Sequence, residues 1–294
     1  MTAVVSVLWA GGRLRDPCEP VVAGTDPGYA TGLGLFETCA VVGGRAFALT
    51  RHLRRLAASA AALELPAVPD DDVREAVAAV LAASGPEVGR LRITVTPGAP
   101  GGPGSGGPAP ARPAAPAPVL VVTAGPAPPR GPAHVVRSAW VRNERSPLAG
   151  HKSTSYAADV LALSAATRAG GNEALLANTR GALCEGATSN VLVERGGELL
   201  TPALSSGCLP GVTRALVLAW AAEAGLPVRE ATADELPWSV VEDARAGAAG
   251  LALAGSLRGV VGVEVVEGAR VAVGPLTAEV ARLFRARAAD DLDP

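Results

Sequence analysis

The chain has 294 residues, with 26 basic and 28 acidic side chains and a formal net charge of −2. This balance argues against a nucleic-acid-binding surface, and no apolar run approaches the roughly 20 residues that span a bilayer. The composition is 49% hydrophobic and 18% charged, which is typical of a globular protein, and the length predicts two domains.

The first part of the chain alternates predicted strands with two predicted helices. The strands cover residues 3–9, 35–42, 45–49, 91–96 and 119–123. Gly43 and Gly44 suit a two-residue hairpin turn, and Thr50 is the predicted N-cap of the helix that follows. A second helix is predicted over residues 71–83, where acidic residues at the start favour the helix dipole.

Residues 97–118 contain eight prolines and six glycines, which predicts a loop. A second Pro-rich stretch follows the next strand. We therefore expect a small N-terminal α/β domain over residues 1–124, a linker over 125–133 and a larger C-terminal domain over 134–294.

The C-terminal part mixes strands and helices again, which predicts an α/β or α+β domain. Its predicted strands cover residues 134–141, 173–178, 190–194 and 250–254, and its predicted helices lie near 155–169, 212–225 and 276–288.

The four cysteines lie far apart, form no CxxC pair and are accompanied by only three histidines, so we expect no metal site. Cys184 and Cys208 are interpreted as small buried residues. The N-terminus has no charged segment followed by a long apolar one, so a signal peptide is not expected and free thiols in the cytoplasm are the simplest interpretation.

Lys152, in the segment GHKSTSY, is the only lysine, since the other 25 basic residues are arginine. A lysine can lose its proton and act as an amine nucleophile, whereas an arginine stays charged. Glu185 follows in CEGATSN, and CLPGVTRAL then opens a helix at Val212 and Thr213, where free backbone amides suit an anion.

In this order, the segments GHKSTSYAADVLAL, NEALLANTRGALCEGATSNVLV and LLTPALSSGCLPGVTRALVLAWA resemble the class IV aminotransferase family. The early segment GLFET…FALTRHLRRL is similar too, and the likeness covers roughly residues 3–96 and 119–265. The resemblance implies a two-domain, fold-type IV, D-amino acid aminotransferase-like enzyme with pyridoxal 5'-phosphate (PLP) in the cleft between the domains. It also implies a homodimer.

The resemblance implies a role for each matching residue. Lys152 would bind PLP covalently and move protons, Glu185 would keep the pyridine nitrogen protonated, and Arg55 would bind the phosphate. The other implied cofactor-binding positions are Tyr156, Asn190, Val212, Thr213, Ser256 and Leu257. Arg92 and Arg258 are candidate partners for a substrate carboxylate.

Within the family, TSYAADVLALSAATRAGGNEALLAN and AGSLRGVVGV are most similar to the 4-amino-4-deoxychorismate lyase branch. The Arg-x-His element of the D-amino acid branch is missing from residues 97–111, and Ser256-Leu257 replaces the Thr-Ala pair of the branched-chain branch. The predicted function is therefore a lyase that releases pyruvate and forms 4-aminobenzoate from a small-molecule amine. The alternatives are an aminotransferase of the D-amino acid or branched-chain type and a non-catalytic PLP-binding protein.

Overall fold

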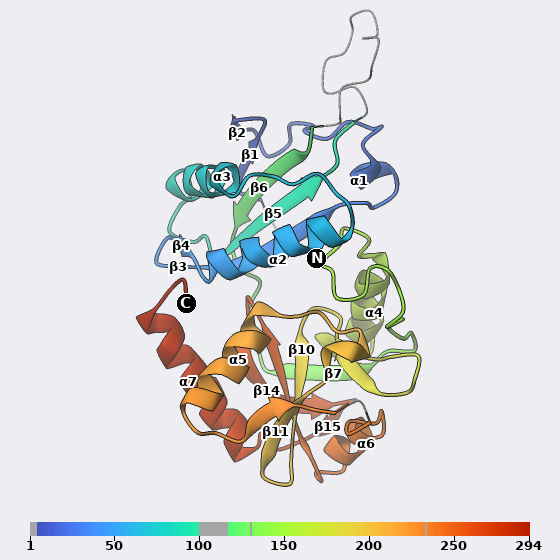
Figure 1. Cartoon of the computed structure of the whole chain (residues 1–294). Helices are drawn as coiled ribbons and strands as arrows, with labels where there is room; N and C mark the ends of the chain where they lie inside the picture. Colours follow the sequence, from blue (N-terminus) through green and yellow to red (C-terminus); the bar gives the residue numbers. More distant parts are fainter. Residues whose placement is uncertain (1–4, 100–116, 130, 233) are drawn as a thin grey trace, which may run out of the picture. The chain divides into compact units, whose positions relative to one another are not determined.

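The computed structural model describes residues 5–99, 117–129, 131–232 and 234–294 (Figure 1). Most of the predicted Pro/Gly loop, residues 100–116, lies outside the described residues. The described chain forms two compact units. Of the described residues, unit 1 comprises 5–99, 117–128, 152–156 and 292–294, and unit 2 comprises 129, 131–151, 157–232 and 234–291.

Unit 1 is a six-stranded sheet of order β2-β1-β6-β5-β3-β4 with two long helices on one face. Its strands are β1 (Val7–Ala10), β2 (Arg13–Arg15), β3 (Leu35–Val42), β4 (Arg45–Ala46), β5 (Arg90–Thr96) and β6 (Val119–Gly125). Its helices are α1 (Pro27–Ala30), α2 (Leu49–Ala62) and α3 (Asp70–Ala82).

The side chains of unit 1 alternate between the two faces of the sheet, as a strand requires. Leu91 and Ile93 of β5 are buried in the apolar core that α2 and α3 cover. The alternate residues of the same strand, Arg90, Arg92 and Thr94, are only partly buried and lie on the opposite face. This division separates a packing face from a polar face.

Two local features of unit 1 test the sequence interpretation. The Gly43-Gly44 hairpin turn is confirmed, because β3 and β4 pair around it and both glycines have positive φ angles. The assignment of Thr50 as N-cap is wrong. Helix α2 begins at Leu49 after Ala48, and the Thr50 amide donates instead to the Asp293 carboxylate at 2.8 Å.

Unit 2 contains a nine-stranded sheet of order β12-β11-β10-β13-β14-β7-β8-β9, with β15 paired to β14. Its strands are β7 (Ala133–Arg137), β8 (Glu173–Ala177), β9 (Leu183–Gly186), β10 (Asn190–Arg195), β11 (Glu198–Thr201), β12 (Val228–Glu230), β13 (Gly250–Gly255), β14 (Gly259–Val266) and β15 (Ala269–Arg270). Its helices are α4 (Ala157–Arg168), η1 (Leu204–Ser206), α5 (Val212–Glu223), α6 (Val240–Arg245) and α7 (Pro275–Asp290).

The predicted mixed α/β fold is confirmed, although β7 ends at Arg137 rather than at residue 141. Lys152–Tyr156, which the sequence analysis placed in the second domain, groups with unit 1. Among the described residues, no helix is long and apolar enough to cross a membrane.

Candidate active site

Lys152 lies beside β3, held by backbone hydrogen bonds within unit 1. The Phe36 amide donates to the Lys152 carbonyl at 2.9 Å, and the Thr154 amide donates to the Gly34 carbonyl at 2.8 Å. The Lys152 Nζ lies 4.4 Å from the centre of the Phe36 ring and 5.7 Å from that of Tyr156. The two rings meet edge to face, so the amine lies against an aromatic surface.

The glycines before β3 explain how the lysine segment comes so close to the strand. A side chain at Gly34 would place its Cβ 2.9 Å from Thr154 Oγ1. Gly32 has a φ of +72°, and its carbonyl accepts hydrogen bonds from the Thr154 and Ser155 hydroxyls. Glycine is therefore required at this close approach.

Arg55 is held by a buried carboxylate on the helix-covered face of the unit 1 sheet. Its Nε and Nη2 donate to the two oxygens of Glu37 at 2.8 and 2.6 Å, and the His52 ring contacts the same carboxylate at 2.7 Å. Burial raises the pKa of Glu37, but the charge and hydrogen bonds of Arg55 outweigh it and, with His52, lower the pKa to about 2. A guanidinium has five N–H donors, so this pair does not exhaust Arg55.

Glu185 lies on β9 in unit 2 and is 6% exposed. One oxygen pairs with Arg142 Nη2 at 3.1 Å, and the other accepts the Leu209 amide at 2.9 Å. The same Arg142 Nη2 lies 2.6 Å from the buried carboxylate of Asp159. These contacts fix the orientation of the Glu185 carboxylate.

The N-terminus of α5 adjoins this carboxylate through Leu209. Asn190 Nδ2 donates to the Leu209 carbonyl at 2.8 Å, and a Cβ at Gly211 would lie 1.9 Å from Asn190 Oδ1. The N-cap residue of α5 is Gly211, which has no side chain to accept a hydrogen bond from the first amides of the helix. Val212 and Thr213, which follow it, are buried. Amides at an uncapped helix N-terminus suit an anion such as a phosphate.

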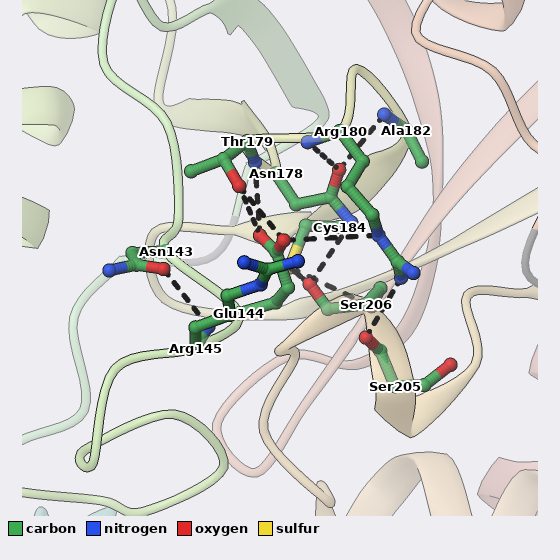
Figure 2. Close-up of polar contacts among 10 residues, drawn as sticks. All are labelled: Asn143, Glu144, Arg145, Asn178, Thr179, Arg180, Ala182, Cys184, Ser205 and Ser206. Carbon is green, nitrogen blue, oxygen red and sulfur yellow. Dashed lines mark hydrogen bonds and ion pairs between the residues drawn. The ribbon is translucent and has the colours of Figure 1, made fainter.

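Figure 2 shows polar contacts around Asn178, in the turn that precedes β9. Asn178 Oδ1 accepts the Arg180 and Ala182 amides and so shapes the turn into β9, while its Nδ2 donates to the Ser206 carbonyl at 3.3 Å. The Cys184 thiol donates to the same carbonyl, also at 3.3 Å. Cys184 is buried as predicted, as is Cys208, and burial raises the pKa of each thiol.

The remaining predicted residues divide between the units. Ser256 and Leu257 follow β13, whose Ala254 pairs with Asn190, so they lie at the same end of the sheet as that asparagine. Arg258 donates to the Asn172 carbonyl at 2.9 Å, a contact within unit 2. Arg92 lies in unit 1 with its Cζ 3.8 Å from the Phe36 ring centre.

The sequence analysis did not single out several residues that hold these groups. Phe36 and Glu37 lie in the GLFET segment, where a carboxylate on the buried side of a predicted strand was a usable signal. Arg142 and Leu209 had none, because their contacts with Glu185 cross 43 and 24 residues of irregular spacing. Among the described residues, no group of three or more histidine, cysteine or acidic side chains forms a metal site.

The amine on its aromatic surface belongs to unit 1, whereas the anchored carboxylate and the N-terminus of α5 belong to unit 2. The chain belongs to the amino-transferase class IV family, whose sequence model matches residues 34–266. PLP is the cofactor of that family, which confirms the predicted cofactor.

Three relatives illustrate the similarity. A Methanocaldococcus jannaschii protein described as a "Putative branched-chain-amino-acid aminotransferase" is 30% identical over 78% of this chain and 82% of its own. "A hypothetical aminotransferase" from Mycobacterium tuberculosis superposes with a TM-score of 0.82 at 26% identity, covering 97% of this chain and 100% of that one. The fold IV transaminase CpuTA1 from Curtobacterium pusillum has a TM-score of 0.74 at 32% identity, covering 95% and 93%.

Proposed function

We propose that the chain is a PLP-dependent enzyme in which Lys152 carries the cofactor and transfers the proton, acting as a 4-amino-4-deoxychorismate lyase. The main support is the position of the single lysine, whose Nζ lies against Phe36 and Tyr156 in a segment that backbone hydrogen bonds fix to β3. Gly32 and Gly34 allow Ser155 and Thr154 of the same segment to approach closely, which supports a fixed position for Lys152.

When bound, PLP supplies an aldehyde that condenses with amines and a ring that withdraws electrons from the reacting carbon. In the proposal, Lys152 Nζ then takes up and returns the substrate proton as a general base and acid. Glu185 would accept a hydrogen bond from the protonated pyridine nitrogen, and its ion pair with Arg142 holds the carboxylate in place for this.

The phosphate is assigned in the proposal to Arg55, to the amides of Val212 and Thr213 and to the Ser256-Leu257 turn. The uncapped start of α5 and the orientation of Arg55 by Glu37 support this assignment. Asn190 orients the Leu209–Gly211 loop, and Tyr156 orders the aromatic surface beside Lys152.

The lyase reaction is supported by sequence features: the resemblance of the segments after Lys152 and around Ser256, and the lack of arginine and histidine in residues 97–111. A second candidate is an aminotransferase acting on a small amine and a 2-oxo acid. The description of the M. jannaschii relative as a branched-chain aminotransferase favours that candidate.

Incubating the purified protein with PLP and aminodeoxychorismate tests the lyase proposal. We expect 4-aminobenzoate fluorescence that Lys152→Ala abolishes, and borohydride reduction that attaches the cofactor to one residue. Turnover of D-alanine or leucine with 2-oxoglutarate, and none of aminodeoxychorismate, would replace the lyase with the aminotransferase. If no visible absorbance band forms with PLP, both reactions are excluded.

We also infer a homodimer, as the family resemblance implies. Val160 and Leu161 on α4 are 53% and 58% exposed, and Trp140 and Val141 of the loop after β7 are 49% and 54% exposed. Large apolar side chains exposed to this extent are typical of association surfaces. Light scattering at micromolar concentration would give twice the 29.3 kDa chain mass if the inference holds.

A further inference from the structure

One arginine of unit 2 lies between two buried carboxylates. Arg142 Nη2 is 2.6 Å from a carboxylate oxygen of Asp159 and 3.1 Å from one of Glu185. Arg142 Nη1 donates to the second Asp159 oxygen at 3.5 Å, so the guanidinium faces Asp159 with both of its terminal nitrogens. The two carboxylates are therefore neighbours across a single nitrogen atom, and we call the three side chains the Arg142 cluster.

The three members of the Arg142 cluster come from different elements of unit 2. The Arg142 amide donates to the Ala177 carbonyl at the end of β8, and β8 pairs with β9, where Leu176 lies opposite Glu185. Asp159 comes from the first turn of α4, whose apolar side chains share a core with those of β8. A loop, a helix and a strand therefore bring the three charges together.

Two carboxylates and one guanidinium give the Arg142 cluster a formal charge of −1. The Asp159 and Glu185 side chains are 5% and 8% exposed, so water screens the excess negative charge only weakly. Burial lowers the pKa of Arg142, but the charges of Glu185 and Asp159 outweigh burial and raise it. The guanidinium is therefore positive and compensates one of its two carboxylates. The neighbouring Cys184 thiol adds no charge, because burial raises its pKa.

Other arginines that pair with two carboxylates have more exposed partners. These pairs join Arg137 with Glu242 and Glu267, and Arg229 with Glu198 and Glu235. The four carboxylate side chains are 24% to 51% exposed, so water and salt screen the second negative charge. In the Arg142 cluster both carboxylates are buried, and the uncompensated charge favours a positively charged group of a ligand.

We propose that Asp159 supplies the negative charge with which Glu185 holds a protonated pyridine nitrogen. This deepens the proposed function and rests on it, because Glu185 is assigned there to the pyridine nitrogen of PLP. Glu185 and Arg142 alone form a neutral pair, which leaves a positive ring without a counter-charge. Asp159 restores one negative charge, and a protonated ring carries one positive charge. Asp159 is thus a positioning residue that acts through Arg142 and selects the protonation state of the ring.

The test compares PLP with the analogue in which carbon replaces the pyridine nitrogen, because that analogue cannot be protonated at this position. The purified chain is freed of cofactor, and its affinity for each compound is measured by calorimetry. Asp159→Asn is expected to reduce the preference for PLP over the analogue about 10- to 100-fold, the effect of losing one unit charge beside a partly buried ion. Asp159→Glu keeps the charge and is expected to restore most of the preference.

A double variant tests the charge count directly. Arg142→Gln combined with Asp159→Asn leaves Glu185 as the one charged member of the cluster and returns its formal charge to −1. We expect this double variant to recover the preference for PLP that Asp159→Asn alone loses. Asp243→Asn is the matched control, since Asp243 is an exposed acid in the first turn of α6 in the same unit. It is expected to leave the preference unchanged.

The alternative is that Asp159 only stabilises the start of α4, where an acidic residue favours the helix dipole. Equal losses of affinity for both compounds in Asp159→Asn would show this role and overturn the proposal. A double variant with no more preference for PLP than Asp159→Asn would overturn it too. If wild type prefers PLP and Asp159→Asn keeps that preference, the inference fails while the proposed function stands. If wild type binds neither compound, the proposed function fails and the inference with it.

Discussion

Replacing Glu37 by glutamine removes the buried negative charge that Arg55 and His52 share. The Glu37 and His52 side chains are 1% exposed and that of Arg55 is 10% exposed, so water cannot replace the lost carboxylate. Glutamine keeps the size of the side chain but offers one acceptor oxygen in place of two. The variant therefore isolates the charge from the packing.

The expected loss of stability in Glu37→Gln follows from the pKa of Glu37. Folding moves it from an ordinary value of 4.5 to about 2, which corresponds to about 3 kcal/mol of stabilisation for the ionised form. Breaking a buried ion pair by removing one partner costs about 3–5 kcal/mol in other proteins. We expect Glu37→Gln to lie near the lower end, because one hydrogen bond to Arg55 is retained.

The assay should report on unit 1 alone, since a two-unit chain has no single well-defined free energy of unfolding. The Cys39 thiol can serve as this reporter, because it lies two residues from Glu37 on β3, points to the same face and is fully buried. Its alkylation rate in native buffer, followed by mass spectrometry of its peptide, measures how often unit 1 opens. A loss of about 3 kcal/mol predicts alkylation about 100-fold faster.

Two controls separate this effect from general destabilisation. Glu75→Gln, at an exposed position of α3, should leave the Cys39 rate unchanged. Cys184, buried in unit 2, should react at the wild-type rate in both variants. A Cys39 rate raised less than fivefold, or an equal rise at Cys184, would refute the reasoning.

Three further predictions follow from other contacts. Because folding lowers the pKa of Glu37, the stabilisation from its ionised carboxylate is present above pH 4.5 and is lost as pH falls towards 2. The difference in hydrogen-exchange rate of the Cys39 peptide between wild type and Glu37→Gln should therefore decrease to zero over that pH range. Gly211→Ala should weaken PLP binding at least 10-fold, because the new Cβ would lie 1.9 Å from Asn190 Oδ1. Gly131→Ala is the control, since a Cβ there has open space around it. Equal PLP affinities of the two variants in a titration would contradict the prediction. Asp293→Ala removes the hydrogen bonds that the Thr50 amide and hydroxyl donate at the start of α2. It should lower the stability of α2 by about 1–2 kcal/mol, measured as faster hydrogen exchange in that helix. Unchanged hydrogen exchange in α2 would contradict the prediction.

The sequence predicted features that depend on neighbouring residues. The Gly43-Gly44 turn and the helix that begins at Val212 each follow from local chemistry and were found where expected. The N-terminal cap of α2 was not predictable, because the Asp293 carboxylate that accepts the Thr50 amide lies 243 positions away in the sequence. For the same reason Thr50, the best local N-cap, was assigned the wrong role.

The candidate site was predicted where a residue type was rare and missed where it was common. A single lysine among 26 basic residues drew attention to Lys152, but its grouping with unit 1 depends on pairing with β3, more than 100 residues earlier. Glu37 was visible within GLFET only as part of a motif. Its role became clear once α2 placed Arg55 and His52 against it.

Arginine shows why the structure adds information that composition cannot. With 25 arginines, composition alone offers no means of ranking them. The structure separates them by counter-ion. Arg55 pairs with the Glu37 carboxylate, so the phosphate binding proposed for it would come from oriented donors rather than from net charge. Arg92, a candidate partner for a substrate carboxylate, has no carboxylate partner among the described residues, so the affinity of a carboxylate bound there should depend on charge and fall with added salt. The salt dependence of substrate binding, compared with that of PLP binding, therefore distinguishes the two kinds of arginine site.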